Sequence, residues 1–444
     1  MNIELVDTRQ QFDALEKAWT ALYRQDPSAN VFLSWRWLKQ LFDRRAEPVC
    51  ILAARSASDN QQYLAFLPLR SRLFIHKERQ RFVRSYALAG NDWADQTGLL
   101  CAPEFEQEAI EALITALSDM CWQSLSFSDM SMSEDRYRAL TAMFSRLDYS
   151  VHERYQTDND GQTRLDVAPC IALPDSHEQY LAGLSANTRQ RLRRMVRVLD
   201  SSDELRIEFS AAADHEQDLT AFVHLWRTQW RDRKGARTDL LADKYRRILQ
   251  QGLDDGNLAL LVLYQADTPV GMIACYLDKA SETVSFFVSA RDLQFDALAG
   301  GLLLHSRMIE WAIANHYRHY HLLRGDEPYK YSLGGVDQPV YSIKVRRSAD
   351  VEKTRFLSED CRTEALQKLL QYRERLGTRQ THRLYAQLLE SWPNDAQTLT
   401  QYAQWLKQIG EHQHANSIEA SLCAADIASG LPEASLRHSE CRIP

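Results

Sequence analysis

The middle of the chain has the clearest alternation of apolar and polar positions. Between residues 166 and 350, three short apolar runs separated by polar turns predict an antiparallel meander of strands. A mostly apolar helix and two more apolar runs follow, and strands joined through a helical crossover indicate a mixed α/β sheet. The predicted strands are 257–265, 270–278, 282–290, 319–323 and 339–347, and the predicted helix is 302–316.

The first 165 residues contain both helical and strand patterns. Apolar positions at helical spacing predict two amphipathic helices, and the apolar runs after them predict strands. A polar, glycine-containing stretch, "TDNDGQTRLDVAP", suits a crossing between domains, so we expect a first domain at 1–165 and a second at 166–350. The predicted helices are 8–25 and 31–44, and the predicted strands are 49–56, 62–72 and 125–130.

The last block, residues 351–444, is polar and predicted to be helical. Its apolar residues recur at helical spacing in two sets, separated by a turn that contains proline, and the pattern resembles one and a half tetratricopeptide-type repeats. A solenoid of such repeats needs at least three of them, so we expect this segment to dock on the rest of the chain or on a protein partner. The two sets are Tyr385, Leu388 and Leu389, and Leu399, Tyr402, Ala403 and Leu406.

The composition indicates a folded protein of two or three domains. The chain has 444 residues, of which 45% are hydrophobic and 25% are charged. Single cores rarely grow beyond about 250–300 residues, and this mixture of residues is typical of globular domains. The net charge of -7 argues against a general nucleic-acid-binding surface, so we expect no DNA partner.

The eight cysteines are scattered singly, and no pair has the spacing of a zinc site. We therefore expect no bound metal. The N-terminus lacks a basic start followed by an apolar stretch, so no signal peptide is predicted. No run of about twenty apolar residues occurs, so no membrane span is predicted either. These features favour a cytoplasmic protein.

The stretch "RGDEPYKYSLGG", residues 324–335, concentrates reactive side chains directly after a predicted strand. Acids, tyrosines, a lysine and an arginine lie close together there, which makes it the first candidate for catalysis. The structural alternative is that Asp326 caps a short helix and that Glu327 and Lys330 form a pair on the helix surface.

A second candidate is the start of the predicted helix 302–316. Ala299, Gly300 and Gly301 precede this helix. The first N–H groups of a helix lack internal partners and attract negative charge, so a pyrophosphate fits there without any basic side chain. The alternative is that these small residues only form a turn.

These motifs resemble a known family. From Cys170 to about Arg347, the order of elements is similar to a GNAT acyltransferase domain, and more narrowly to CelD/BcsL-like acetyltransferases of polysaccharide biosynthesis. The FemABX peptidyltransferases, which use aminoacyl-tRNA, share the "YKYSLGG" arrangement. The usual phosphate-binding signature keeps only its small residues, in "FDALAGG". The likeness rests on "ANTRQRLRRMVRVL", "VGMIACYL", "FFVSARDLQFDALAGGLLLHSRMIEWA" and "LLRGDEPYKYSLGG" in the second domain, and on "FLSWRWLKQLF" and "GNDWADQTGLL" in the first.

The resemblance implies two GNAT-like α/β halves and a helical tail. The second half would bind acetyl-CoA, and the first would shape the cleft for the acceptor. The implied function is acyl-CoA-dependent N- or O-acetyl transfer to a saccharide or glycan precursor. Two alternatives stay open: FemABX-like aminoacyl transfer from tRNA, and a non-catalytic scaffold in a polysaccharide-assembly complex that uses its tail.

The chemistry of acyl transfer suggests roles for these residues. Lys330 would supply positive charge to the oxyanion or the donor phosphates, and Asp326 and Glu327 would take the acceptor proton or bind the acceptor. Tyr329 or Tyr331 would protonate the leaving group. The residues expected to contact acetyl-CoA are Phe295, Ala299, Gly300, Gly301 and Leu302.

Acceptor-binding candidates are more scattered. Trp37 is a candidate for stacking on a sugar ring, although a tryptophan in a core or an interface is commoner. Asp92 and Asp95 suit sugar hydroxyls or cap a turn. Arg189 and Arg193 belong to an arginine stripe on a predicted helix, which suits phosphates or is an ordinary solvated face.

Overall fold

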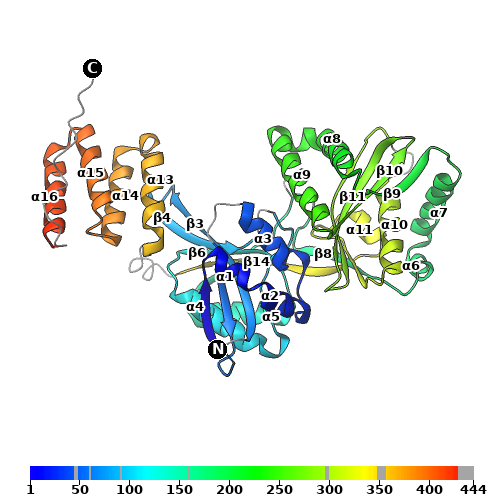
Figure 1. The fold of residues 1–444 in the computed structure, drawn as a ribbon, viewed down its shortest axis with the longest axis horizontal. Helices are drawn as coiled ribbons and strands as arrows, with labels where there is room; N and C mark the ends of the chain where they lie inside the picture. The colour runs from blue at the N-terminus through cyan, green and yellow to red at the C-terminus, as the bar shows by residue number, and fades with distance from the viewer. Residues whose placement is uncertain are drawn as a thin grey trace, which may run out of the picture.

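The structure, a computed structural model, has two halves that each contain part of a sheet, and helices at the C-terminal end project away from the first half (Figure 1). The predicted mixed α/β fold with a helical C-terminal segment is confirmed. Among the residues described, no helix combines the length and apolar character needed to cross a bilayer. The structure describes residues 1–44, 49–59, 62–90, 93–158, 161–295, 300–347 and 357–428.

In the first half, the predicted helix 8–25 is two helices. A capping box between Thr8 and Gln11 starts the first, and it ends where the N–H of Leu15 donates to the carbonyl of Phe12. The helices are α1 (Arg9–Ala14), α2 (Glu16–Gln25), α3 (Trp35–Arg44), α4 (Glu106–Asp119) and α5 (Glu134–Arg146). The strands are β1 (Asn2–Val6), β2 (Cys50–Arg55), β3 (Tyr63–His76), β4 (Arg81–Leu88), β5 (Leu100–Cys101), β6 (Ser124–Ser131) and β7 (Ser150–Glu153).

In the second half, the predicted antiparallel meander is confirmed as β10, β11 and β12. The chain then passes through α10 and returns as β13, which is parallel to β12 and antiparallel to β8. The strands are β8 (Val167–Ala172), β9 (Leu205–Phe209), β10 (Leu258–Gln265), β11 (Thr268–Asp278), β12 (Thr283–Arg291) and β13 (His319–His321). The helices are α6 (His177–Gly183), α7 (Ala186–Asp200), α8 (His215–Lys234), α9 (Thr238–Asp254), α10 (Gly300–Ala314) and α11 (Pro328–Ser332).

One strand, β14 (Val336–Arg346), belongs to both halves. Its residues 336–339 pair with β8 of the second half, and its later residues pair with β6 and β7 of the first. The strands therefore form one path, with β14 in the middle of the order β1-β2-β3-β4-β6-β14-β8-β13-β12-β11-β10-β9. The last strand of the second half thus completes the sheet of the first half.

The two halves also share an apolar core. Phe32 and Trp37 of the first half pack edge-on against Tyr276 of β11, and Phe287 of β12 lies against the same group. Trp37 is only 5% exposed. Because this contact buries large aromatic surfaces, it fixes how the two halves face each other.

The helical tail docks on the β3–β4 hairpin of the first half. Leu73 and Phe82 of the hairpin join the apolar core of the tail. The Gln387 side chain accepts a hydrogen bond from the N–H of Phe82 (2.7 Å) and donates one to its carbonyl (3.0 Å). The tail therefore finds its docking partner within the chain, although its likeness to tetratricopeptide repeats stays a prediction. Its helices are α13 (Arg362–Tyr372), α14 (Thr378–Ser391), α15 (Ala396–Gln408) and α16 (His412–Ala428).

Candidate active site

A tight loop joins β13 to α11 and contains the start of the "RGDEPYKYSLGG" stretch. The N–H of Leu323 donates to Nδ1 of His321 at 3.0 Å, and Leu323 has a φ of 57°, in the left-handed region. Gly325 has a φ of +116°, and a Cβ there would lie 2.3 Å from Oε2 of Glu327. Position 325 therefore needs glycine for its backbone conformation and for the space that the Glu327 carboxylate occupies.

Lys330 lies under this loop and holds it together. The side chain is buried, and Nζ donates to the carbonyls of Leu323 (3.1 Å) and Arg324 (2.6 Å). Oε2 of Glu327 lies 3.0 Å from the same nitrogen. Burial lowers the pKa of Lys330, and the Glu327 carboxylate opposes that shift. These three partners match the three donors of an ammonium group, so the lysine organises the loop through two carbonyls and one carboxylate.

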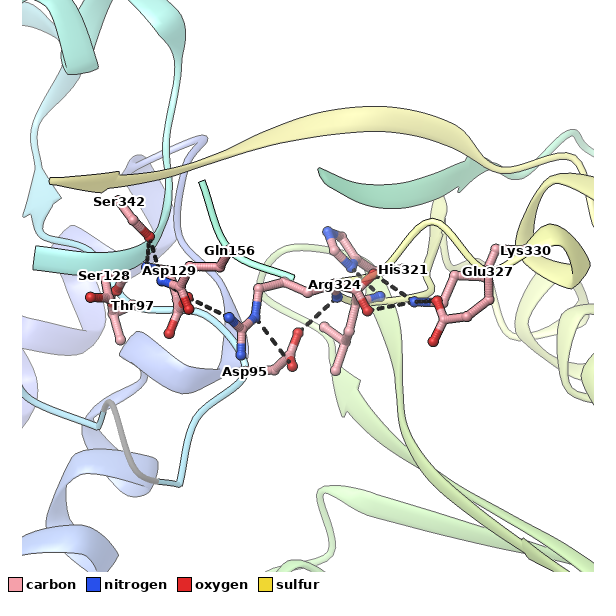
Figure 2. Close-up of polar contacts among 11 residues, drawn as sticks. Asp95, Thr97, Ser128, Asp129, Gln156, His321, Arg324, Glu327, Lys330 and Ser342 are labelled. Atoms are coloured by element: carbon pink, nitrogen blue, oxygen red, sulfur yellow. Dashed lines mark hydrogen bonds and ion pairs between the residues drawn. The ribbon is translucent and has the colours of Figure 1, made fainter. Parts of the chain in front are cut away.

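Arg324 connects the loop to the first half of the chain. Its backbone N–H donates to Oδ2 of Asp95 at 2.8 Å, and its side-chain Nε lies 3.4 Å from Oδ1 of the same carboxylate. Its guanidinium also forms an ion pair with Asp129. Figure 2 shows Arg324 between these two carboxylates, with Lys330 and Glu327 on the other side of the loop.

Asp129 is itself held in an unusual conformation at the end of β6. Its φ is 64°, which is uncommon for a residue with a side chain. Its N–H donates to Oγ of Ser342 on β14 (2.9 Å), and Nε2 of Gln156 donates to both Asp129 Oδ1 (3.2 Å) and Ser342 Oγ (2.9 Å). Burial raises the pKa of Asp129, and Arg324 opposes that rise. The network therefore runs from the loop, through the first half, to the strand that both halves share (Figure 2).

A buried histidine lies beside the same loop. His305 of α10 has its Nδ1 2.7 Å from the hydroxyl of Tyr320, and its ring stacks on Tyr329 with centroids 5.7 Å apart. Burial, with a smaller effect of Lys330, lowers the pKa of His305 to about 3. Its imidazole is therefore neutral at pH 7. The Tyr329 residue is 38% exposed as a whole, while burial, with a smaller effect of Glu327, raises the pKa of its phenol.

The structure places the expected catalytic residues together. Lys330, Glu327, Asp326 and Tyr329 all lie on the loop or on α11. Asp326 does not cap this helix: its Oδ1 accepts a hydrogen bond from the N–H of Arg164 (2.8 Å), while Glu327 is the N-cap residue. The pair of Glu327 with Lys330 is formed, but it lies under the loop rather than on an exposed helix face.

The expected acetyl-CoA contacts are only partly described. Ala299 lies outside the described residues, and Gly300 is the first residue of α10. Among the residues that the structure describes, a Cβ at Gly301 would meet no atom within 4 Å. Leu302 is buried and Phe295 packs at the edge of the second-half core.

The expected acceptor residues separate into different places. Asp95 joins the Arg324 network, whereas Asp92 lies outside the described residues. Trp37 lies at the contact between the halves and lines a small pocket together with Gln40, Leu41, Trp93 and Ile248. Arg189 donates to the carbonyls of Ala182 and Leu184 and so caps the end of α6, while Arg193 is exposed on α7.

The structure brings to this site three further residues that had no predicted role. Arg324 belongs to the candidate stretch. Asp129 is the penultimate residue of a predicted strand, and His305 interrupts an apolar helix, and both positions are unusual for a polar residue. These positions could be recognised in the sequence, but the residues that they contact could not.

Comparison with known proteins agrees with the geometry of the second half. Residues 186–331 match the family model described as "Acetyltransferase (GNAT) domain". This range begins at the first residue of α7 and ends at Tyr331 of α11, so it includes the start of α10 and the Lys330 loop. This part of the chain is therefore similar to GNAT acetyltransferase domains. Comparison with curated protein sequences gives no match.

Solved structures show a likeness over most of the chain. The crystal structure of FemX has a TM-score of 0.55 at 8% identity and covers 77% of this chain and 97% of its own. A conserved protein of unknown function from Bacteroides thetaiotaomicron has a TM-score of 0.49 at 12% identity, covering 78% of this chain and 100% of its own. At such low identity the likeness to FemX concerns the fold, and it extends over both halves.

Proposed function

We propose that this chain is an acyl-CoA-dependent acetyltransferase that acts on an amine or hydroxyl of a saccharide or glycan precursor. The observation that carries the proposal is the GNAT match over 186–331, which contains the start of α10 and the Lys330 loop. The resemblance to CelD/BcsL-like acetyltransferases supports the saccharide acceptor. In this proposal the protein works in the cytoplasm, and its helical tail offers a surface to a protein partner.

The donor would bind at the start of α10. A Cβ at Gly301 would meet no atom of the described residues within 4 Å there, and the free N–H groups and the dipole of the helix favour a pyrophosphate. From that end, α10 leads within about one turn to His305, which stacks on Tyr329. The thioester would therefore lie near Tyr329 and the Lys330 loop.

The reaction needs one proton transfer at each end. The acceptor nitrogen or oxygen attacks the thioester carbonyl, a new N–C or O–C bond forms, and the C–S bond then breaks. In the proposed roles, the Glu327 carboxylate, which is 40% exposed, takes the acceptor proton, and the phenol of Tyr329 supplies a proton to the leaving thiolate. Lys330 would add positive charge near the oxyanion. Asp326 stands beside them as the alternative base.

A second candidate function is aminoacyl transfer from tRNA. It is favoured by the likeness to FemX, because that likeness covers both halves and nearly all of the FemX chain. The same loop would then act on an ester in place of a thioester.

The test uses the full chain with radiolabelled acetyl-CoA and a panel of nucleotide sugars and oligosaccharides, and follows free thiol and labelled product. A parallel reaction offers aminoacyl-tRNA. Glu327→Gln and Tyr329→Phe should each lower acetyl transfer by at least about tenfold, while Glu204→Gln, an exposed control before β9, should not. Transfer from tRNA alone would establish the second candidate, and no transfer from either donor would favour the scaffold.

A further inference from the structure

Three side chains with metal-binding atoms meet in the helical tail, far from the loop described above. They are His382 of α14, Glu411 in the turn before α16, and His414 in the first turn of α16. Each offers one ligand atom, and these atoms all lie within 4.8 Å of one another. Glu411 Oε1 is 3.2 Å from His382 Nε2, and Glu411 Oε2 is 3.3 Å from His414 Nδ1.

These distances suit a tetrahedral zinc ion. Zinc–nitrogen and zinc–oxygen bonds of about 2.0–2.2 Å place neighbouring ligand atoms roughly 3.4 Å apart. The two contacts, which involve different oxygens of the Glu411 carboxylate, are close to this value. The His382 and His414 rings are nearly parallel, with an interplanar angle of 8° and centroids 5.9 Å apart. Both rings therefore present a nitrogen atom to the same carboxylate.

The orientation of His382 is fixed by residues that lie behind it. Its Nδ1 is 2.8 Å from the hydroxyl of Tyr402, and its ring packs edge-on against Trp405 with centroids 4.9 Å apart. When Nδ1–H donates to that hydroxyl, Nε2 keeps its lone pair toward Glu411. Metal-binding histidines are commonly held through their second nitrogen in this way.

We propose that His382, Glu411 and His414 form a site for one zinc ion, with the fourth position open to water. Two imidazoles and one carboxylate suit zinc, whereas magnesium and calcium prefer sites made of oxygen atoms. No local sequence motif indicates this site, because His382 and Glu411 are 29 positions apart.

The site would act as a cross-link within the tail. It joins α14 to the start of α16, a helix whose described apolar contacts with the tail core come from Ala415, which is buried, and from Ile418, which is partly buried. A metal bond between these helices would limit the opening of α16, because ligands on two separate elements must stay together. The zinc would thus connect two helices of the tail, and this role is independent of acyl transfer.

The first test measures zinc affinity. The full chain is stripped with a chelator and titrated with zinc chloride in competition with a chromophoric chelator. His414→Ala should lower the affinity of one zinc by at least about a hundredfold, and Tyr402→Phe should lower it by about tenfold. His412→Ala removes an exposed histidine two positions away that is not part of the cluster, and it should change nothing.

The second test measures the cross-link itself. Zinc should slow proteolytic cleavage within α16 in the wild-type chain and in His412→Ala, but not in His414→Ala. Equal zinc affinity in the wild type and His414→Ala would overturn the site. Retained affinity without protection of α16 would overturn the structural role. Neither result depends on acetyl transfer, so this proposal and the proposed function can fail separately.

Discussion

Two arginines in this chain each contact two aspartates, and they differ mainly in how far they and their partners are exposed. Arg324 joins Asp95 and Asp129 between the two halves; its side chain is 15% exposed and those of its partners are 26% and 10% exposed. Arg227 joins Asp239 and Asp243 across the α8–α9 pair; it is 34% exposed, and its partners are 70% and 59% exposed. Surface pairs of the second kind contribute little to stability, whereas breaking a buried pair leaves a charge without compensation.

The origin of the partners differs as well. Asp243 follows Arg227 by 16 positions within one helical hairpin. Asp95 and Asp129 precede Arg324 by 229 and 195 positions. Arg227 therefore needs only local structure, whereas the Arg324 network requires the complete sheet with β14 in place. A site between halves is thus assembled only in the folded chain, and it depends on the buried lysine beneath the loop.

The largest effect of a substitution is expected at Lys330, the buried lysine beneath the loop that contains Arg324. Lys330→Ala leaves two carbonyls and the Glu327 carboxylate without their common donor. We expect a loss of about 3 kcal/mol in the free energy of unfolding and a decrease in turnover of about a hundredfold or more. Urea unfolding and acetyl-CoA-dependent thiol release measure the two quantities.

The matched control for this variant is Lys39→Ala. Lys39 pairs with Asp43 on the surface of α3, and its removal should cost less than about 0.5 kcal/mol. If Lys330→Ala lost stability but kept normal turnover, the loop would be architecture rather than part of the catalytic machinery.

The next effect is a pH dependence of stability. Nδ1 of His321 accepts a hydrogen bond from the N–H of Leu323. Burial lowers the pKa of His321 to about 4. Asp95 opposes this shift, while Lys330 and His319 add to it. Between pH 6.5 and 4 the unfolded chain takes up a proton that the folded chain excludes. The stabilising contribution is therefore complete above pH 6.5 and decreases as the pH falls, by about 2 kcal/mol at pH 5.

His321→Gln keeps a hydrogen-bond acceptor but does not titrate. The difference in unfolding free energy between pH 7 and pH 5, measured in urea, should shrink by about 2 kcal/mol in this variant. The exposed histidine of α8 provides the control, because His224→Gln should leave that difference unchanged. An equal pH dependence in His321→Gln and the wild type would contradict the prediction.

Most of the local elements could be predicted from the sequence. The β10–β12 meander and α10 follow from apolar periodicity, which depends on neighbouring residues. The double pairing of β14 could not be predicted, because its two sets of partners come from distant parts of the chain. The elements that were not predicted include the strands β1, β4, β5, β7, β8 and β9 and the helices α4, α5 and α9. In α4 the helical signal was present, because Ala109, Ile110, Leu113, Ile114 and Leu117 recur at helical spacing and are buried.

In the candidate site, too, the local features could be predicted from the sequence and the contacts between distant residues could not. The stretch around Lys330 was recognisable from its concentration of reactive residues, and its pair with Glu327 was foreseen as one alternative. The burial of that pair was not predicted, because it depends on the absence of a Cβ at Gly325, which leaves space for the Glu327 carboxylate. The arginines of α7 looked equally suggestive in sequence, yet Arg189 caps α6 and Arg193 is exposed. The presence of charged residues alone therefore does not distinguish the stretch around Lys330 from the arginines of α7.

A double-mutant cycle compares the two arginines directly. In the first cycle, Arg324→Met is combined with Asp129→Asn, and in the second, Arg227→Met is combined with Asp243→Asn. We expect a coupling energy of about 1.5 kcal/mol for the buried pair and about 0.3 kcal/mol for the surface pair, from urea unfolding. Added salt should reduce the second value more than the first. Equal coupling energies would mean that burial between the halves adds nothing to the Arg324 network.

The smallest change in stability is expected at Gly301, where the comparison is between an open glycine and a constrained one. The new methyl group of Gly301→Ala meets no atom of the described residues within 4 Å, so the unfolding free energy should change by only a few tenths of a kcal/mol, in the stabilising direction of an alanine in a helix. Gly325→Ala should be clearly destabilising, because its φ is +116° and a Cβ would clash with Glu327.

If the start of α10 binds the donor, Gly301→Val should weaken acetyl-CoA binding by about tenfold in calorimetric titration while the fold is retained. Unchanged affinity in Gly301→Val would remove this end of α10 from the donor site.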